Sequence, residues 1–411
     1  MTITRAMLET LDKDDPLAPF RDEFDLPPGV LYLDGNSLGV LPKAAKARML
    51  RVVEQEWGRG LIRSWNDAGW IDLPARVGGA IAGLIGAHTD EVIVADSTSV
   101  NIFKLAAAAM RMRPGRRVIL SEPGNFPTDL YMAQGLADFL GGTVAVRTVA
   151  PADIPAALTE DVALLLLTQV HYKTGRLHDM ADLTARAQAV GALTLWDLSH
   201  SAGALDVDLN GAGADFAVGC GYKYLNGGPG APAFLYVARR HQGAAVQPLS
   251  GWMGHAAPFD FDDAYRPADG MRRHLCGTPP ILGLSALEEG VALMARADMA
   301  CIREKSRRLG DLFIALVEQR CGGVFGLISP READRRGSHV SLSHADGYAI
   351  MQALIARGVI GDFRAPDALR FGFTPLYLRH VDLWDAVAHL ADILHTGDYR
   401  QPRFQIKAAV T

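Results

Sequence analysis

The sequence is poor in cysteine and has neither a long hydrophobic run nor a large excess of charge of one sign. Its four cysteines form no CxxC pair, which argues against a zinc knuckle or a thioredoxin-like site and suits a reducing compartment. The longest aliphatic run, Val162 to Leu167, is six residues, whereas a membrane helix needs about 20. The first residues lack the apolar core of a signal peptide, so we expect a cytoplasmic protein with no membrane partner.

Net charge and chain length further restrict the class of protein. Lys and Arg number 41 against 46 Asp and Glu, a net charge of −5, which argues against a nucleic-acid partner. The histidines show no ligand-like spacing, so no metal is expected. A chain of 411 residues suggests two to three domains. The 42 glycines exceed the usual share of about 7% without a collagen period, so they must serve turns and close backbone approaches.

Hydrophobic patterning predicts an α/β protein in which strands alternate with helices. A mixed, mostly parallel sheet flanked by helices is expected in a large domain at 46–280. A smaller α+β domain is expected at 281–411, with the segment 1–45 packed near it. Strands are predicted at 91–95, 117–120, 143–146, 162–167, 192–196, 215–219, 233–237, 324–328, 338–343 and 369–373. Helices are predicted at 43–57, 74–87, 99–112, 127–140, 179–190, 281–297, 298–319, 345–357 and 381–395.

Polar side chains follow the predicted strands, at the edge where α/β sheets bind ligands. Each has an ordinary alternative: a hydroxyl at a helix start can be a plain N-cap, and an acid three residues before a histidine can be a cap with its partner. These residues are Ser97 and Thr98, Phe126 and Asp129, Thr168, Asp197 and His200, and Tyr222 and Lys223.

Among these residues, Lys223 says most about the kind of reaction. It lies in a glycine-rich loop after an apolar strand, where an unpaired ammonium is costly to bury. A lysine that forms a Schiff base escapes that cost and then serves as a general base, although a surface lysine in a turn is equally compatible with the loop alone. A phosphate cradle, an aromatic ring, an acid for a pyridinium nitrogen and this lysine follow in chain order. That combination predicts a pyridoxal 5′-phosphate site.

The order of these motifs resembles fold-type I pyridoxal-phosphate enzymes of the aspartate-aminotransferase superfamily, and more closely the kynureninases. The stretches that carry the resemblance run from residue 32 to residue 377, nearly the whole chain. They include YLDGNSLG (32–39), EWGRGLIRSWNDAGW (56–70), STSVN (97–101), NFPTD (125–129), WDLSHSAGALDVDL (196–209), GCGYKYLNGGPGAPAF (219–234), GWMGH (251–255) and LRFGFTPLY (369–377). The resemblance implies hydrolysis of L-kynurenine to anthranilate and L-alanine in tryptophan catabolism.

The resemblance also implies residue roles. Lys223 would hold the cofactor as a Schiff base, Asp197 would face the pyridinium nitrogen with His200 nearby, and Phe126 would stack on the ring. The phosphate side would involve Ser97, Thr98, Thr168 and Tyr222, with Asp129 beside the cofactor. Tyr222 is either an acid/base or only a phosphate ligand. In the family's homodimer, Trp252 and Thr278 would reach the neighbouring subunit's site. Arg370 would bind the substrate carboxylate, and Asn36 and Trp65 would line the substrate pocket.

The resemblance also bears on the substrate. Animal-type kynureninases carry Asn where this chain has Thr278, which favours kynurenine over 3-hydroxykynurenine as the substrate.

The sequence also bears on three other functions. A cysteine desulfurase would need a reactive cysteine on a mobile loop, and no activating environment is readable around Cys276. A nicotinamide dehydrogenase would need a GxGxxG motif after the first strand, which is missing. A non-catalytic scaffold would be favoured by loss of Lys223, Asp197 or Arg370, and all three are present.

Overall fold

The computed structural model describes residues 2–407, which fold as two compact units. Unit 1 holds residues 2–43, 170–177 and 297–407, and unit 2 holds residues 44–169 and 178–296. The predicted domain boundaries stay a prediction, and these units differ from them at α10 (Ile281–Ala295), which belongs to unit 2. There, Glu288 of α10 pairs with Arg76 at 2.7 Å, and Gly290 gives α10 close access to the backbone of Leu225.

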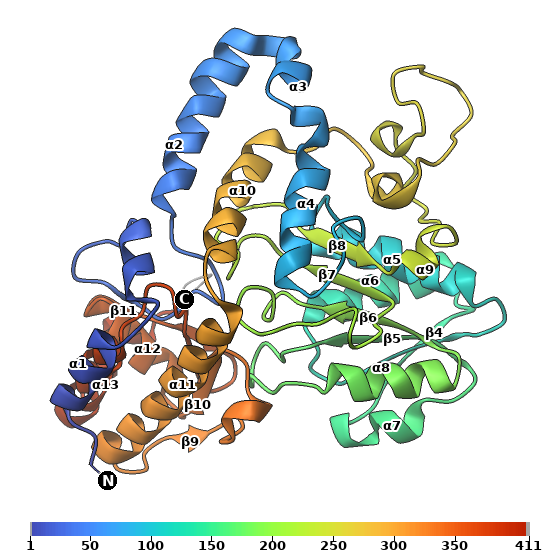
Figure 1. The fold of residues 1–411 in the computed structure, drawn as a ribbon. Helices are drawn as coiled ribbons and strands as arrows, with labels where there is room; N and C mark the ends of the chain where they lie inside the picture. Colours follow the sequence, from blue (N-terminus) through green and yellow to red (C-terminus); the bar gives the residue numbers. More distant parts are fainter. Residues whose placement is uncertain (1, 408–411) are drawn as a thin grey trace. The chain divides into compact units, whose positions relative to one another are not determined.

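Unit 2 is built on a seven-stranded sheet in the order β2-β8-β7-β6-β5-β3-β4, drawn in Figure 1. β8 alone runs in the opposite direction to the other strands of this sheet, so the predicted mixed, mostly parallel sheet is confirmed. The strands are β2 (Val92–Val94), β3 (Val118–Ser121), β4 (Ala145–Thr148), β5 (Val162–Thr168), β6 (Leu193–Asp197), β7 (Phe216–Gly219) and β8 (Phe234–Val237).

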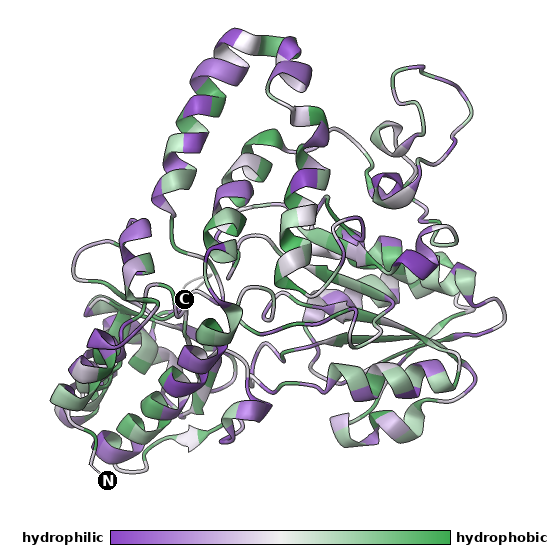
Figure 2. Ribbon diagram, in the orientation of Figure 1, coloured by the Kyte–Doolittle hydropathy of each residue, from purple (hydrophilic) through white to green (hydrophobic). Residues whose placement is uncertain are grey.

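Helices cover both faces of this sheet because its central strands are apolar on both sides. Leu164 and Leu195 pack into a core with the alanine-rich helix α5, whereas Trp196, the next residue along β6, donates a hydrogen bond to Thr184 of α8 at 3.1 Å. In Figure 1, α5 and α6 lie on one side of the strands and α7 and α8 on the other. Figure 2 shows the strands as mainly hydrophobic and α8 as mixed. The helices of unit 2 are α2 (Lys43–Arg51), α3 (Ser64–Asp67), α4 (Leu73–Leu84), α5 (Thr98–Met112), α6 (Pro127–Phe139), α7 (Ile154–Ala157), α8 (Met180–Ala189), α9 (Arg239–Gln242) and α10, with short helices η2 (Val52–Gly60), η3 (Leu61–Arg63), η4 (Trp70–Asp72), η5 (Pro151–Asp153), η6 (Trp252–Gly254) and η7 (Gly270–His274).

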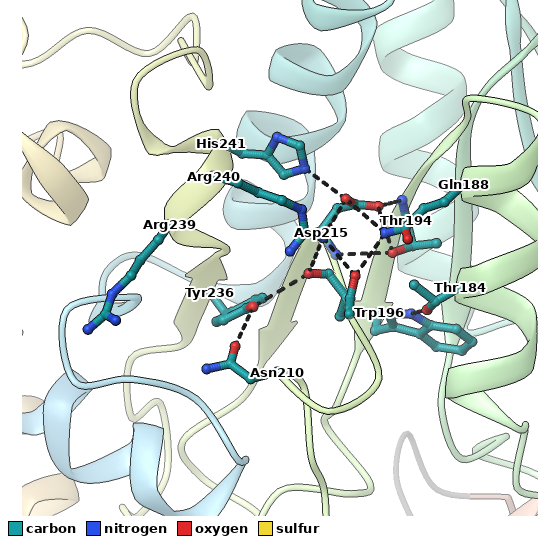
Figure 3. A network of polar contacts seen from close by, with 12 residues as sticks. Thr184, Gln188, Thr194, Trp196, Asn210, Asp215, Tyr236, Arg239, Arg240 and His241 are labelled. Carbon is teal, nitrogen blue, oxygen red and sulfur yellow. Dashed lines mark hydrogen bonds and ion pairs between the residues drawn. The ribbon is translucent and has the colours of Figure 1, made fainter.

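A network of hydrogen-bonded polar side chains lies at the amino ends of β6 and β7 (Figure 3). Asp215, which immediately precedes β7, is buried and accepts hydrogen bonds from the backbone nitrogen of Thr194 (2.9 Å) and from Arg240 (2.8 Å). The His241 ring lies 2.7 Å from the same carboxylate. Burial alone would raise the pKa of Asp215, but these partners outweigh it and the pKa is lowered. The network therefore fastens the sheet at the edge opposite its carboxyl ends.

Unit 1 combines helices with an antiparallel sheet in the order β12-β13-β10-β9 and a parallel pair β1-β11. The strands are β1 (Leu31–Tyr32), β9 (Gly326–Leu327), β10 (His339–Ser343), β11 (Val359–Ile360), β12 (Asp362–Arg364) and β13 (Ala368–Gly372). The helices are α1 (Arg5–Lys13), α11 (Met299–Cys321), α12 (Gly347–Ala356), α13 (His380–Thr396) and α14 (Pro402–Gln405), with η1 (Ala18–Glu23), η8 (Ala333–Arg335) and η9 (Asp398–Arg400).

The expected elements are present with ends within three residues of those predicted, apart from the helix expected at 43–57. Its regular α-helical part ends at Arg51 and continues as a π-helix to Gly60. Within that wider coil the Glu56 side chain is held by Arg48 and by the Trp70 indole at 2.8 Å. Within residues 2–407, no helix is both long and apolar enough to cross a membrane, and no cluster of side chains is suited to hold a metal ion.

Candidate active site

The carboxyl ends of the parallel strands in unit 2 bring several predicted site residues together. Thr168 ends β5 and stands opposite Asp197, which ends β6, in the strand register. Lys223 follows β7 by four residues, and its Nζ lies 5.6 Å from the centre of the Phe126 ring and 5.8 Å from that of Tyr222. These residues gather at one edge because parallel strands end on the same side of a sheet.

Lys223 is buried between two acids. Lys223 is only 8% exposed, and Asp197 and Asp129 are 3% and 0% exposed. Burial raises the pKa of Asp129 well above its usual range, with a further rise from the charge of Asp197, while Lys223 opposes both. Burial also raises the pKa of Asp197, against hydrogen bonds from Ser199 and the charge of Lys223. Two carboxyl groups with raised pKa values beside a buried lysine, at the end of a sheet, are typical of a functional site.

Each acid is held by a neighbour that the sequence did not single out. The backbone nitrogen and the hydroxyl of Ser199 donate to Asp197 Oδ1 at 2.8 and 2.6 Å. Asn125 donates its amide to Asp129 Oδ2 at 3.2 Å and accepts from the backbone nitrogen of Thr168 at 3.0 Å. Asn125 thus ties the loop after β3 to the end of β5. Its position just before α6, in the same motif as Asp129, was the available signal for this role.

Glycines shape the loop that carries Lys223. A Cβ on Gly221 would lie 2.4 Å from the Pro232 carbonyl oxygen, and one on Gly227 would lie 2.7 Å from the Gly221 carbonyl oxygen. The loop can therefore fold back tightly only without side chains at these positions. Asn226 also adopts a positive φ of 55° in the same turn. This accounts for part of the glycine excess in the composition.

The residues present fit pyridoxal phosphate. Asp129 Oδ1 and Thr168 Oγ1 are buried polar atoms without a hydrogen-bond partner among the described residues, as expected where a ligand supplies the partner. Ser97 caps α5, accepting from the Val100 nitrogen at 3.4 Å, so the first turn of a 15-residue helix offers backbone donors to an anion. Burial and the neighbouring Cys220 and Asp197 raise the pKa of Tyr222, so its hydroxyl stays protonated and can donate to a phosphate.

Four other predicted residues also belong to unit 2. His200 is buried in the turn that follows β6. Trp65 packs edge-on against Trp70, with ring centres 6.0 Å apart. Trp252, 40% exposed, borders a cleft of about 310 Å³, and Thr278 is exposed just before α10. Their predicted roles in the substrate pocket and across a dimer stay predictions.

Asn36 and Arg370 belong to unit 1. Both are buried, and with the Asn36 amide oxygen turned toward the guanidinium it accepts from Arg370 Nε at 2.9 Å. Gly372, two residues beyond Arg370, makes room for Asn36, because a Cβ there would lie 2.5 Å from the Asn36 Cγ atom. The structure thus joins two residues that the sequence assigned to the same substrate.

Comparisons with known proteins decide the family. A family model described as the kynureninase C-terminal domain matches residues 302–390. Proteins named kynureninase from Burkholderia mallei (strain SAVP1) and Pseudomonas fluorescens are 56% and 53% identical to this chain, each over 99% of it and 100% of the relative. The chain belongs to the kynureninase family. It is an enzyme of kynureninase type, a hydrolase acting on carbon–carbon bonds with a small-molecule substrate, and its cofactor is pyridoxal phosphate.

Solved structures confirm the fold of this member of the kynureninase family. A cysteine desulfurase from Thermococcus onnurineus NA1 aligns with a TM-score of 0.78 at 19% identity, covering 92% of this chain and 98% of that one. A cysteine desulfurase from Escherichia coli aligns with a TM-score of 0.74 at 21% identity, again over 92% and 98%. The predicted fold-type I architecture is therefore confirmed, while identities this low speak for the fold alone.

The cysteines do not favour a desulfurase in this family member. A nucleophilic cysteine needs a lowered pKa, whereas burial raises the pKa of Cys220, Cys276 and Cys321. The Cys276 thiol donates to the Leu249 carbonyl at 2.9 Å, which engages it in a hydrogen bond. Cys301, the fourth, also has a raised pKa.

Proposed function

We propose that this protein hydrolyses the Cβ–Cγ bond of L-kynurenine, giving anthranilate and L-alanine, in the tryptophan catabolism of the cytoplasm. The proposal rests on one observation: Lys223 is buried beside Asp197 and Asp129 at the carboxyl edge of the sheet. The chain is also more than half identical to proteins named kynureninase. Thr278 supports a preference for kynurenine over 3-hydroxykynurenine.

The chain's residues divide the chemical work. Pyridoxal phosphate, when bound, supplies an electron sink for the substrate's α-carbon. Lys223 would hold the cofactor covalently and, once released by the substrate amine, would remove the α-proton through its Nζ. Asp197, fixed by Ser199, would keep the cofactor's ring nitrogen protonated. Phe126 would stack on the ring, and its distance from Lys223 Nζ suits that position.

The phosphate side would rest on the start of α5. Ser97 and Thr98 contribute the free end of a helix, where backbone N–H groups favour an anion. Thr168 Oγ1 is a buried donor available to the cofactor. Because the raised pKa of Tyr222 keeps its hydroxyl protonated, we assign it to donation rather than to proton removal. Tyr222 would therefore act as a phosphate ligand and proton donor, with His200 close to Asp197.

Substrate recognition would draw on Arg370, Asn36 and Trp65. A guanidinium binds a carboxylate through two parallel hydrogen bonds, which suits the α-carboxylate of an amino acid. We also propose a homodimer in which Trp252 and Thr278 of one subunit complete the site of the other. The exposure of Trp252, next to the exposed Phe259 and Phe261, supports an interface there.

Replacement of Lys223 tests the proposal. Lys223→Ala should remove the visible absorbance of the lysine-bound cofactor and abolish turnover of L-kynurenine. Lys173→Ala is the matched control, because Lys173 also follows a strand of the sheet but donates to the Ala365 carbonyl in unit 1. It should keep the absorbance band. A Lys223→Ala protein with full turnover would show that the chemistry is assigned to the wrong residue.

A further inference from the structure

Arg370 is the centre of a buried charged cluster in unit 1. It stands opposite Asp362 in the register of β13 and β12, and the two side chains form an ion pair at 2% exposure each. Its guanidinium also donates to the Ser37 hydroxyl at 2.9 Å and to the Tyr172 carbonyl at 2.7 Å. With Asn36 on Nε, four separate groups fix the plane of the guanidinium. Asp362 also binds Arg364 at 2.7 Å.

Asp34 adjoins this cluster with no countercharge of its own. Its backbone bridges to Gly372, two residues from Arg370, and its Oδ1 is buried with no hydrogen-bond partner among the described residues. The Ser37 hydroxyl, which contacts Asp34, also lies 3.0 Å from the Asp362 carboxylate. Burial, with the charge of Asp362, raises the pKa of Asp34 to about 7, although Arg370 pulls the other way.

The groups that face Asp34 come from three strands. They are Tyr32 of β1, Asp362 and Arg364 of β12, and Arg370 of β13. Two guanidinium groups therefore balance two carboxylates, namely Asp362, which pairs with both of them through its Oδ2 atom, and Asp34, which titrates near neutrality. A carboxylate ligand on Arg370 would add a third negative charge in this buried space, where like charges are costly. Protonating Asp34 restores the balance.

We propose that Asp34 is a positioning residue that takes up one proton from solvent when a substrate carboxylate binds to Arg370. This rests on the proposed role of Arg370 as the carboxylate ligand. The proton goes to the free Oδ1 of Asp34, which becomes neutral, and no other bond is made or broken. Because the coupling is reciprocal, carboxylate ligands bind more tightly below the pKa of Asp34 than above it.

The test measures binding of L-alanine to the holoenzyme, followed by the absorbance of the bound cofactor between pH 5.5 and 8.5. The wild type is compared with Asp34→Asn, which keeps the shape but cannot titrate. The ratio of the dissociation constants at pH 8 and pH 6 should be about fivefold larger in the wild type, as a one-unit rise of the Asp34 pKa on binding requires over this pH range. The other ionisable groups of the ligand and the cofactor contribute equally to the pH dependence of the dissociation constant in both proteins.

L-Alaninamide, which lacks the carboxylate, provides the ligand control and should show the same ratio in both proteins. A wild-type ratio for L-alanine equal to that of Asp34→Asn overturns the proposal. If Asp34→Asn does not fold, proton uptake by the wild type on adding L-alanine is measured near pH 7 in weak buffer with an indicator dye. Uptake beyond that seen with L-alaninamide supports the proposal, and equal uptake overturns it.

Arg370→Gln separates this inference from the proposed function. A large loss of L-alanine affinity in Arg370→Gln, with no pH effect in Asp34→Asn, leaves the role of Arg370 standing and removes only the role of Asp34. Unchanged L-alanine affinity in Arg370→Gln removes the proposed carboxylate ligand and the inference with it.

Discussion

At the scale of single residues, the site depends on side chains that fix other side chains. Lys223, Asp197 and Asp129 could be found from sequence because each follows a strand and belongs to a recognisable motif. Asp34 and Asp362 could not be assigned, and the role of Asn125 could be found only in part, because these roles arise from pairings between strands and loops distant in the chain. The bond from the Thr168 nitrogen to Asn125 links residues 43 positions apart.

Asn125 provides the first prediction. Asn125→Ala removes both of its buried hydrogen bonds and should lower the free energy of unfolding by about 1–3 kcal/mol. Asn125→Asp keeps an acceptor for the Thr168 nitrogen but places a second carboxylate against Asp129. Although Asp and Asn have nearly the same shape, the repulsion between the two carboxylates should weaken cofactor retention. Cofactor loss during dialysis, followed by absorbance, measures this effect.

Gln134→Ala is the matched control, since Gln134 makes a similar amide–acid contact to Asp138 on the exposed side of α6. Equal cofactor retention in Asn125→Asp and Gln134→Ala would contradict the bridging role of Asn125.

Asp215 provides a prediction of pH dependence. Its pKa is lowered in the folded protein, so its stabilising contribution is present above the unfolded value of about 3.9 and is lost as the pH falls through the lower folded value. Asp215→Asn should therefore destabilise the protein at pH 7, by about 2–4 kcal/mol, and by less near pH 3. Thermal unfolding at the two pH values measures the difference.

The exposed partner of Asp215 gives the contrast. Arg240→Ala, whose side chain is half exposed, should cost less than about 1 kcal/mol. Because the network lies at the amino ends of β6 and β7, turnover of folded Asp215→Asn protein should be retained. A pH-independent loss of stability would rule out a charged Asp215 in the network.

At the scale of elements, most helices and strands could be predicted because the central strands are continuously apolar and helices such as α5, α8 and α11 begin at a capping side chain. The π-helix from Val52 to Gly60 could not, since it depends on the contact of Glu56 with the distant Trp70. Strand β12 was also missed, because three residues with two charges carry no apolar pattern. Sheet order likewise needs the structure: β3 pairs with β5 although β4 lies between them in the chain.

The close packing of helix α4 on strand β2 can be tested with two of its glycines. A Cβ on Gly78 would lie 2.5 Å from the Val92 carbonyl oxygen of β2, whereas one on Gly83, on the exposed side, would meet nothing within 4 Å. Gly78→Ala should therefore destabilise the protein by about 1–3 kcal/mol. Gly83→Ala should stabilise it by about 0.5–1 kcal/mol through helix propensity. Chemical denaturation of both variants provides the comparison, and a stabilised Gly78→Ala would show that α4 does not pack this closely.

At the scale of the whole molecule, the fold is shared with cysteine desulfurases while the sequence belongs to the kynureninase family. The chemistry therefore rests on the residues at the strand ends rather than on the architecture. Because no thiol is assigned a role, Cys276→Ala should change the rate of L-kynurenine turnover by less than about twofold. A loss of activity beyond tenfold, with the cofactor still bound, would place Cys276 in the site.

The most direct test of the central claim is a product assay on the purified holoenzyme. With L-kynurenine, the fluorescence of anthranilate should appear together with an equal amount of L-alanine, faster than 3-hydroxyanthranilate forms from 3-hydroxykynurenine. Equal rates with the two substrates would contradict the preference inferred from Thr278. Sulfide released from cysteine, with no anthranilate from L-kynurenine, would contradict the function itself.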